Sequence, residues 1–153
     1  MSAFDLSEKG VEKTRLLADR CRVQVKAFRA DLNSFRLEEE YDILYSTGVL
    51  HHIPPAIRQE IFENYKRMTR TGGLNAFSVF VSKPFIAPAQ DAEPTAHKWI
   101  SGELFTYYHD WRIDYCTEEI FDCMSSGVPH KHATNRMIAR KESCQQDASP
   151  GRR

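Results

Sequence analysis

The chain is poor in net charge, in long apolar runs and in paired cysteines. Its 21 Lys and Arg side chains balance its 21 Asp and Glu side chains, so it lacks the basic excess that nucleic-acid binding usually requires, and we expect no nucleic-acid partner. No apolar stretch approaches the roughly 20 residues that span a bilayer, and the amino terminus lacks a basic segment followed by an apolar one. We therefore expect a soluble, cytoplasmic protein with no membrane partner.

The cysteines do not form a recognised paired motif. No CxxC pair occurs among the four of them, Cys21, Cys116, Cys123 and Cys144. They lie in segments of different predicted type, which favours reduced structural thiols over disulfides or a zinc site. The chain has 153 residues, of which 41% are hydrophobic, enough for one ordinary core. We predict one domain over residues 1–141 and a disordered polar tail over residues 142–153.

The most informative segment runs from Tyr41 to Pro54. Its apolar run at residues 43–45 is too short for a helix and too continuous for a half-exposed strand, which predicts a strand of a parallel sheet covered on both faces. The two prolines at positions 54 and 55 are predicted to open a helix at its first turn. The polar turn between strand and helix then lies at the carboxyl end of the strand, where open parallel sheets bind their ligands.

Apolar periodicity divides the rest of the chain into alternating strands and helices. Strands are predicted at about residues 2–6, 23–31, 41–46 and 74–81, with helices after the first and third of them, the second helix ending at Thr71-Gly72-Gly73. This alternation is typical of a right-handed parallel α/β sheet. Prolines within Lys83 to Lys98 predict a long functional loop. A short helix at 103–108 and strands at 111–115 and 133–141 are predicted to end the domain with an antiparallel hairpin.

Several motifs in this order resemble the class I S-adenosylmethionine-dependent methyltransferases. They are Phe4-Asp5-Leu6, Ala30-Asp31-Leu32, Tyr41-Asp42-Ile43-Leu44 with Val49-Leu50-His51-His52-Ile53, and Thr71-Gly72-Gly73. The stretch from Ser101 to Tyr108, with Trp111 and the ending Arg136 to Lys141, is similar more narrowly to the tellurite-resistance methyltransferases of the TehB type. The resemblance covers about residues 3–141. It implies a Rossmann-like α/β sheet, mostly parallel with an antiparallel carboxyl-terminal hairpin.

The resemblance also implies a site for the cofactor S-adenosyl-L-methionine. The matching residues are Asp5 and Leu6 for the ribose hydroxyls, Asp31 and Leu32 for the adenine, and Ser46, Thr47 and Gly48 for the sulfonium end, with Leu50 and His51 closing over it. A carboxylate suits a diol because it supplies acceptors for two donors. A helix N-cap role for the first aspartate and a turn role for the second remain open as alternatives.

Methyl transfer needs few catalytic side chains, because the enzyme mainly aligns the nucleophile with the methyl carbon and excludes water. His51 is a candidate for facing the substrate, although adjacent residues such as His51 and His52 are expected to point apart. In the family, basic residues and histidine near the last hairpin are implicated in handling an oxyanion, which makes Arg112 and Arg136 candidates here. A solvated or structural role for these two arginines is the alternative. Cys123-Met124-Ser125-Ser126 stands where a His-Arg pair is expected. The acceptor implied is a small molecule, a tellurite- or selenite-type oxyanion or a thiol.

A metal site is not predicted. His130 and His132 alternate along an extended segment, so they share one face and suit a ligand. However, no carboxylate or cysteine lies at a recognised ligand spacing from them. A histidine-based metalloprotein therefore stays a third interpretation.

The family's first strand and its glycine-rich turn, of the type Asp-x-Gly-x-Gly, have no counterpart here, because no Gly-x-Gly occurs. Glycine allows close backbone approach to the cofactor in such turns. We therefore expect a sheet without its first strand and helix. The alternative function is a catalytically inactive methyltransferase remnant that acts as an interaction module. Because the absence of a central strand exposes apolar strand edges, we expect repair, either by a homodimer or by rearranged strand pairing.

Overall fold

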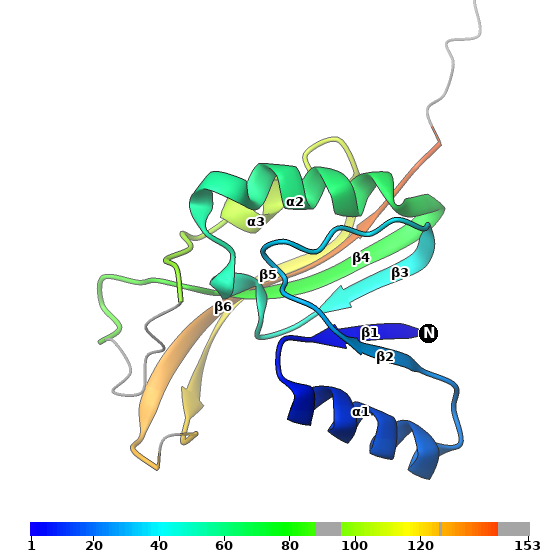
Figure 1. Cartoon of the computed structure of the whole chain (residues 1–153). Helices are drawn as coiled ribbons and strands as arrows, with labels where there is room; N and C mark the ends of the chain where they lie inside the picture. The colour runs from blue at the N-terminus through cyan, green and yellow to red at the C-terminus, as the bar shows by residue number, and fades with distance from the viewer. Residues whose placement is uncertain (88–95, 126, 144–153) are drawn as a thin grey trace, which may run out of the picture.

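The computed structural model describes residues 1–87, 96–125 and 127–143 (Figure 1). The elements follow in the order β1 (Ser2–Asp5), α1 (Glu8–Cys21), β2 (Lys26–Arg29), β3 (Tyr41–Ser46), the 3-10 helix η1 (Leu50–His52), α2 (Pro55–Arg67), β4 (Thr69–Val81), α3 (Glu103–Thr106), β5 (Arg112–Cys123) and β6 (His130–Arg140). In this part of the chain, no helix is long and apolar enough to cross a membrane.

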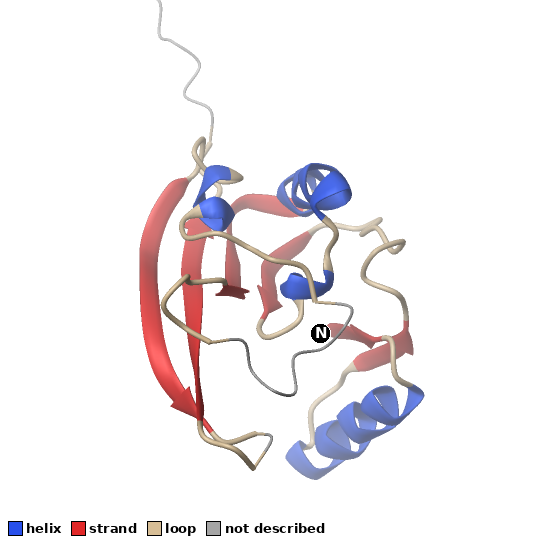
Figure 2. Ribbon diagram, turned by 90° about the vertical axis from the view of Figure 1, so that its left-hand side faces the viewer, coloured by secondary structure: helices blue, strands red, loops and turns tan. Residues whose placement is uncertain are grey.

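The strands form two separate ladders. β1 and β2 pair in parallel, and the second sheet has the order β3-β4-β6-β5. In the second sheet β3 is parallel to β4, whereas β6 runs antiparallel to both β4 and β5. Figure 1 shows α2 and α3 on one side of the larger sheet and α1 with β1 and β2 at the other. Figure 2 shows the long strands on one side of the molecule, well separated from α1.

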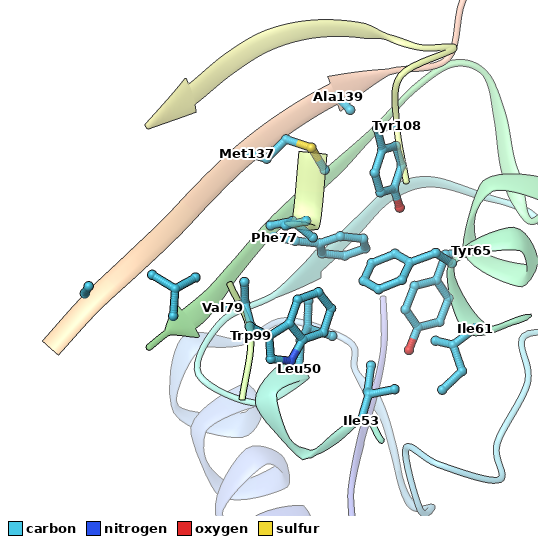
Figure 3. Close-up of a cluster of buried hydrophobic side chains, with 14 residues drawn as sticks. Leu50, Ile53, Ile61, Tyr65, Phe77, Val79, Trp99, Tyr108, Met137 and Ala139 are labelled. Carbon is cyan, nitrogen blue, oxygen red and sulfur yellow. The ribbon is translucent and has the colours of Figure 1, made fainter. Parts of the chain in front are cut away.

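The core lies between α2, α3 and the larger sheet (Figure 3). α2 forms because Pro55 fits the first helical turn and because apolar residues recur on one face at Ile61, Phe62 and Tyr65. Phe62 is almost fully buried and stacks on Tyr107, with ring centroids 4.6 Å apart. Burial of such a side chain contributes roughly 1.5–3 kcal/mol. The loop residue Trp99 is also fully buried in this core, so the core ties the segment before α3 to α2.

The prediction that β3 is covered on both faces is wrong. Its side chains at Ile43 and Tyr45 are 61% and 73% exposed, and only Leu44 between them packs against the core. β3 is an edge strand of its sheet, and successive side chains of a strand point to opposite faces. The continuous apolar run is therefore a half-exposed strand with an apolar outer face.

The predicted glycine cap of the second helix is also wrong. α2 ends at Arg67, and Gly72 and Gly73 lie inside β4. A Cβ atom on Gly73 would come within 2.7 Å of the carbonyl oxygen of Asp42 in β3. The glycine therefore permits the close approach of two strands whose register shifts at this point.

The antiparallel carboxyl-terminal hairpin is present and longer than predicted. β5 runs to Cys123, whereas the sequence predicted a strand at 111–115 only. Exposed and half-buried residues alternate from Cys116 to Cys123, and pairing with β6 continues over almost the whole length of β5. Residues 88–95 of the predicted loop and residues 144–153 of the predicted tail lie outside the described residues.

Candidate functional site

The carboxyl end of β1 holds Asp5 against the first turn of α1. Its Oδ1 atom accepts a hydrogen bond from the backbone N–H of Ser7 at 2.7 Å, while Ser7 itself is the helix N-cap. A Cβ atom on Gly10 would lie 2.6 Å from the Asp5 carboxyl carbon. Gly10 therefore leaves the space that the Asp5 carboxylate occupies, a role that its position inside a predicted helix did not reveal. Leu6, the next residue, is 60% exposed.

The turn after β2 lies beside that of β1, because the Ala30 N–H donates to the Asp5 carbonyl at 3.1 Å. Asp31 is exposed, and its Oδ1 atom accepts the N–H of Asn33 at 2.9 Å. The turn role left open for this aspartate is thus real, although an exposed carboxylate retains acceptor capacity for a ligand. Leu32 packs against the hydrophobic core, which anchors the turn.

The turn after β3 opens into free space. Thr47 and Ser78 of β4 share a hydrogen bond between their hydroxyl groups at 2.7 Å. Gly48 has a φ of +66°, and no atom beyond its two chain neighbours lies within 4 Å of the place where its Cβ would be. Ser46 pairs with Phe77 at the end of the parallel ladder. Glycine is favoured here because other residues rarely adopt positive φ.

The three turns face the same side of the molecule. β1 and β2 are parallel and in register, and Figure 1 shows β3 and β4 running in the same direction as β1. The carboxyl ends of parallel strands are the usual ligand-binding edge of open α/β sheets. A cavity of about 570 Å³ beside α1 lies elsewhere, because Met1, Ser2 and Lys26 at the amino ends of β1 and β2 line it.

Leu50 does not extend toward this edge. Its side chain is completely buried in the hydrophobic core. A side chain with no exposed surface does not close over a cofactor, contrary to the expectation from the sequence. The η1 turn instead uses Leu50 as its anchor. The neighbouring His51 ring lies 5.3 Å from the ring of Phe80 and 4.2 Å from the ring of His52, measured between centroids. The prediction that the two histidines point apart is therefore wrong.

The two candidate arginines lie at different levels of the sheet. Arg136 pairs with Ser78 across the β4–β6 ladder, level with the turn after β3. Its guanidinium forms an ion pair with Glu119 at 3.2 Å and is half exposed. Arg112 pairs with Arg140 at the other end of the hairpin, near the amino end of β3. The structure thus brings Arg136, and not Arg112, toward the polar turns.

Ion pairs explain the pKa of Arg112. Its guanidinium donates to Asp114 at 2.7 Å and lies 2.6 Å from Glu142. The hydrogen bond to Asp114, with the negative charge of both carboxylates, raises the pKa of Arg112. The same bond lowers the pKa of the Asp114 carboxyl. Arg112 is therefore already engaged by carboxylates, in addition to being far from the turns.

Arg58 is a positioning residue that the sequence did not reveal. Its side chain is 2% exposed, and its guanidinium lies 3.8 Å from the centroid of the Trp99 ring. It donates to the carbonyl of Ile53, just after η1, to the carbonyl of Lys98, and to Glu103 at 2.5 Å. It thus connects the His51 turn to the segment before α3. Charged side chains are rarely fully buried, and the sequence carries no signal that this one is.

The hairpin places Cys123 beside His130 and His132. The two histidines share a face, as predicted, with their Nε2 atoms 2.9 Å apart. The pKa of the Cys123 thiol is lowered, chiefly by its hydrogen bonding with Ser125, with a further contribution from His130. The sequence did not reveal the cysteine as a neighbour because a turn separates it from the histidines.

Comparisons with known proteins place this chain in a family. Residues 1–133 match the family described as tellurite resistance protein TehB. The structure of TehB from Haemophilus influenzae is similar, with a TM-score of 0.80 and 22% identity over 92% of this chain and 49% of that chain. A methyltransferase structure from Bacillus halodurans covers 93% of this chain and 83% of its own, with a TM-score of 0.66 and 16% identity. These likenesses confirm the Rossmann-like α/β methyltransferase fold.

Among curated proteins, the chain is similar to hemagglutinin 1 of Eikenella corrodens. The two are 29% identical over 111 residues, which are 72% of this chain and 36% of that protein. The chain thus spans about half the length of the TehB structure and about a third of this curated relative.

Proposed function

The chain belongs to the TehB family of tellurite resistance proteins, and from that membership we propose that it is a methyltransferase domain that uses S-adenosyl-L-methionine. The observation that supports this most is the convergence of three polar turns at the carboxyl ends of β1, β2 and β3. Each turn is anchored by its own hydrogen bonds, so the polar groups are held before a ligand arrives. Such pre-organisation reduces the entropic cost of binding.

Each turn has a distinct role in this proposal. The carboxylate of Asp5 accepts hydrogen bonds from the ribose hydroxyls, and Asp31 with Leu32 contacts the adenine. Ser46, Thr47 and Gly48 line the sulfonium end, where the open space at Gly48 admits a ligand without a side-chain clash. The bound cofactor supplies an electrophilic methyl group. The protein aligns the acceptor with it and excludes water.

We propose a small nucleophile as the acceptor, a tellurite- or selenite-type oxyanion or a thiol. Arg136 supports an oxyanion because its half-exposed guanidinium lies level with Ser78 and Thr47. A guanidinium binds oxyanions through paired N–H donors. His51 is the second candidate for the acceptor side, because its ring lies against the ring of Phe80, which belongs to β4 as Ser78 does. Arg112 has no part in this proposal.

The test is binding of S-adenosylhomocysteine to the purified 153-residue chain, measured by isothermal titration calorimetry. Loss of a hydrogen bond to a charged group costs about 1.5–3 kcal/mol, so Asp5→Ala and Asp31→Ala are each expected to weaken binding about tenfold or more. Asp19→Ala is the matched control, because Asp19 lines the cavity at the opposite ends of β1 and β2. Equal weakening by Asp19→Ala would indicate that the ligand binds in that cavity, and it would refute the proposed site.

The rival function is a catalytically inactive interaction module. It is favoured by the apolar outer face of β3, where Ile43 and Tyr45 are exposed on an edge strand, because such edges pair with other chains. A chain that is folded by circular dichroism but shows no heat of binding at millimolar S-adenosylhomocysteine would support this rival. The same edge leads us to propose a homodimer, to be tested by sedimentation equilibrium with Tyr45→Lys as the dissociating variant.

The location and the range of partners remain part of the proposal. We propose a cytoplasmic protein that does not bind nucleic acid, because its positive and negative side chains balance. A fluorescence-anisotropy titration with labelled duplex DNA and RNA at low salt checks the second point. Saturable binding that weakens with salt would contradict it.

A further inference from the structure

The distal end of the β5–β6 hairpin brings together three side chains that are common metal ligands. In the register of the ladder, Cys123 lies directly opposite His130, and Phe121 lies opposite His132. Directly paired residues share a face, and so do residues two apart on one strand. Cys123, His130 and His132 therefore project from the same face, and one ligand atom from each lies within 4.8 Å of the other two.

Hydrogen bonding prepares the His130 ring as a ligand. Its Nδ1 atom lies 2.8 Å from the carbonyl oxygen of Val128. Since a carbonyl oxygen only accepts, we assign the ring proton to Nδ1, which leaves a lone pair on Nε2 in the neutral ring. Metal-bound histidines typically donate their other ring N–H to a backbone carbonyl or a carboxylate in this way. The Nε2 atom faces that of His132 at 2.9 Å.

We propose that Cys123, His130 and His132 bind a Zn²⁺ ion, with a fourth coordination position open to water or a small molecule. One thiolate and two imidazoles are a ligand set that suits zinc, and three protein ligands with an open position are typical of reactive zinc sites. The thiol proton of Cys123 is released to the buffer when the Zn–S bond forms. No other co-reactant is needed.

The distances suit a tetrahedral ion after small side-chain movements. Zn–N distances of about 2.0–2.1 Å and Zn–S distances of about 2.3 Å place ligand atoms roughly 3.3–3.6 Å apart. The two imidazole nitrogens, now 2.9 Å apart, must separate slightly, and the most distant pair, within 4.8 Å, must approach.

A cavity borders the proposed site on the side of His130. A cavity of about 300 Å³ adjoins His130 and is lined by Phe85, Ile86, Ala87, Val128, Pro129, His130 and Lys131. On the other side, the rings of Phe80 and Phe121 lie 4.8 and 5.8 Å from the ring of His132. Apolar neighbours restrict water around a metal and hold the ligand rings in place.

The charged residues of the same hairpin are directed elsewhere. Lys131 lies between the two histidines in the sequence, so its side chain projects from the opposite face. There it forms an ion pair with Asp122 at 2.6 Å. Neither an ammonium group nor its counter-ion therefore competes for the ligand face.

The experiment is a competition titration of Zn²⁺ into the full chain, purified without a polyhistidine tag, against a chromophoric chelator. We expect one equivalent to bind. Removal of a ligand in Cys123→Ser or His132→Ala is expected to lower the affinity by about tenfold or more, the size of effect that even outer-shell changes produce. Cys116→Ser and His109→Ala are the matched controls, since both are exposed residues outside the cluster. Each control is expected to leave the affinity unchanged.

A second readout keeps the test decisive if a variant fails to fold. Co²⁺ added to the unmodified chain is expected to give the intense visible bands of a tetrahedral site and a near-ultraviolet thiolate charge-transfer band. Absence of the thiolate band would overturn the proposal, as would equal zinc affinity in the folded Cys123→Ser variant. Weaker binding in Cys116→Ser would also overturn it, by assigning the thiolate to another cysteine. None of these readouts depends on methyl transfer.

Discussion

Replacement of Arg58 tests how the η1 turn is held. The guanidinium is almost completely buried, and it satisfies two backbone carbonyls as well as the Glu103 carboxylate. Arg58→Met keeps the apolar stem over Trp99 but removes the charge and its donors. Breaking a buried ion pair from one side costs about 3–5 kcal/mol, because the remaining charge is left uncompensated. Against a typical total stability of about 5–15 kcal/mol, this is a large loss.

The matched control is Arg36→Met. Arg36 also pairs with a glutamate of α2, Glu60, at 2.8 Å, but the two side chains are 25% and 65% exposed. Exposed pairs contribute about 0–1 kcal/mol. The assay is urea unfolding followed by far-ultraviolet circular dichroism, since Trp99 fluorescence would respond directly to the loss of its arginine neighbour. If both variants lose the same free energy of unfolding, the argument from burial is refuted.

The remaining predictions concern pH. Burial raises the pKa of Tyr65 from 10.0 to about 12. The stability that the neutral phenol contributes is therefore complete below pH 10 and is lost as the pH rises toward 12. In thermal melts across that range, Tyr65→Phe should remove up to about 2–3 kcal/mol of this alkaline loss of stability. A hydrogen bond from Lys83 lowers the pKa of the Glu118 carboxyl, so its contribution is present above the unfolded-state pKa and is lost as pH falls through the folded-state pKa. Glu118→Gln should therefore flatten the acid side of the stability profile, and an unchanged acid slope would contradict the assignment.

The resemblance to TehB-type methyltransferases is confirmed by the family match, and the alternation of strands and helices predicted the fold class. Local patterns failed where a tertiary contact decided the outcome. The apolar run of β3 fits a covered strand or the edge of a sheet equally well, and only the sheet order distinguishes them. Likewise, Gly72 and Gly73 fit a helix end, but Gly73 serves the close approach of β4 to Asp42.

The candidate site was predictable where residues adjoin strand ends and not elsewhere. Asp5, Asp31 and Thr47 lie at strand ends that hydrophobic patterning locates. Arg58 gave no such signal, because a helix of mixed polarity does not indicate which charged residue becomes buried against a distant loop. Cys123 gave none either, because its nearness to the histidines depends on the register of a hairpin whose first strand was predicted too short.

The two faces of the larger sheet separate the buried core from the residues of the proposed sites. Residues 77, 79 and 81 of β4 are buried in the core, whereas the alternate residues Ser78 and Phe80 lie on the opposite face. That opposite face carries Arg136 through its pairing with Ser78, and the Phe80 ring there contacts both His51 and His132. Substitutions of Ser78, Phe80, His51 or Arg136 should therefore alter cofactor or zinc affinity with little effect on unfolding, because none of them belongs to the buried core cluster. A ligand at the η1 turn and a metal on the hairpin would both adjoin the Phe80 ring, which makes that ring the structural element through which the two proposed sites would influence each other.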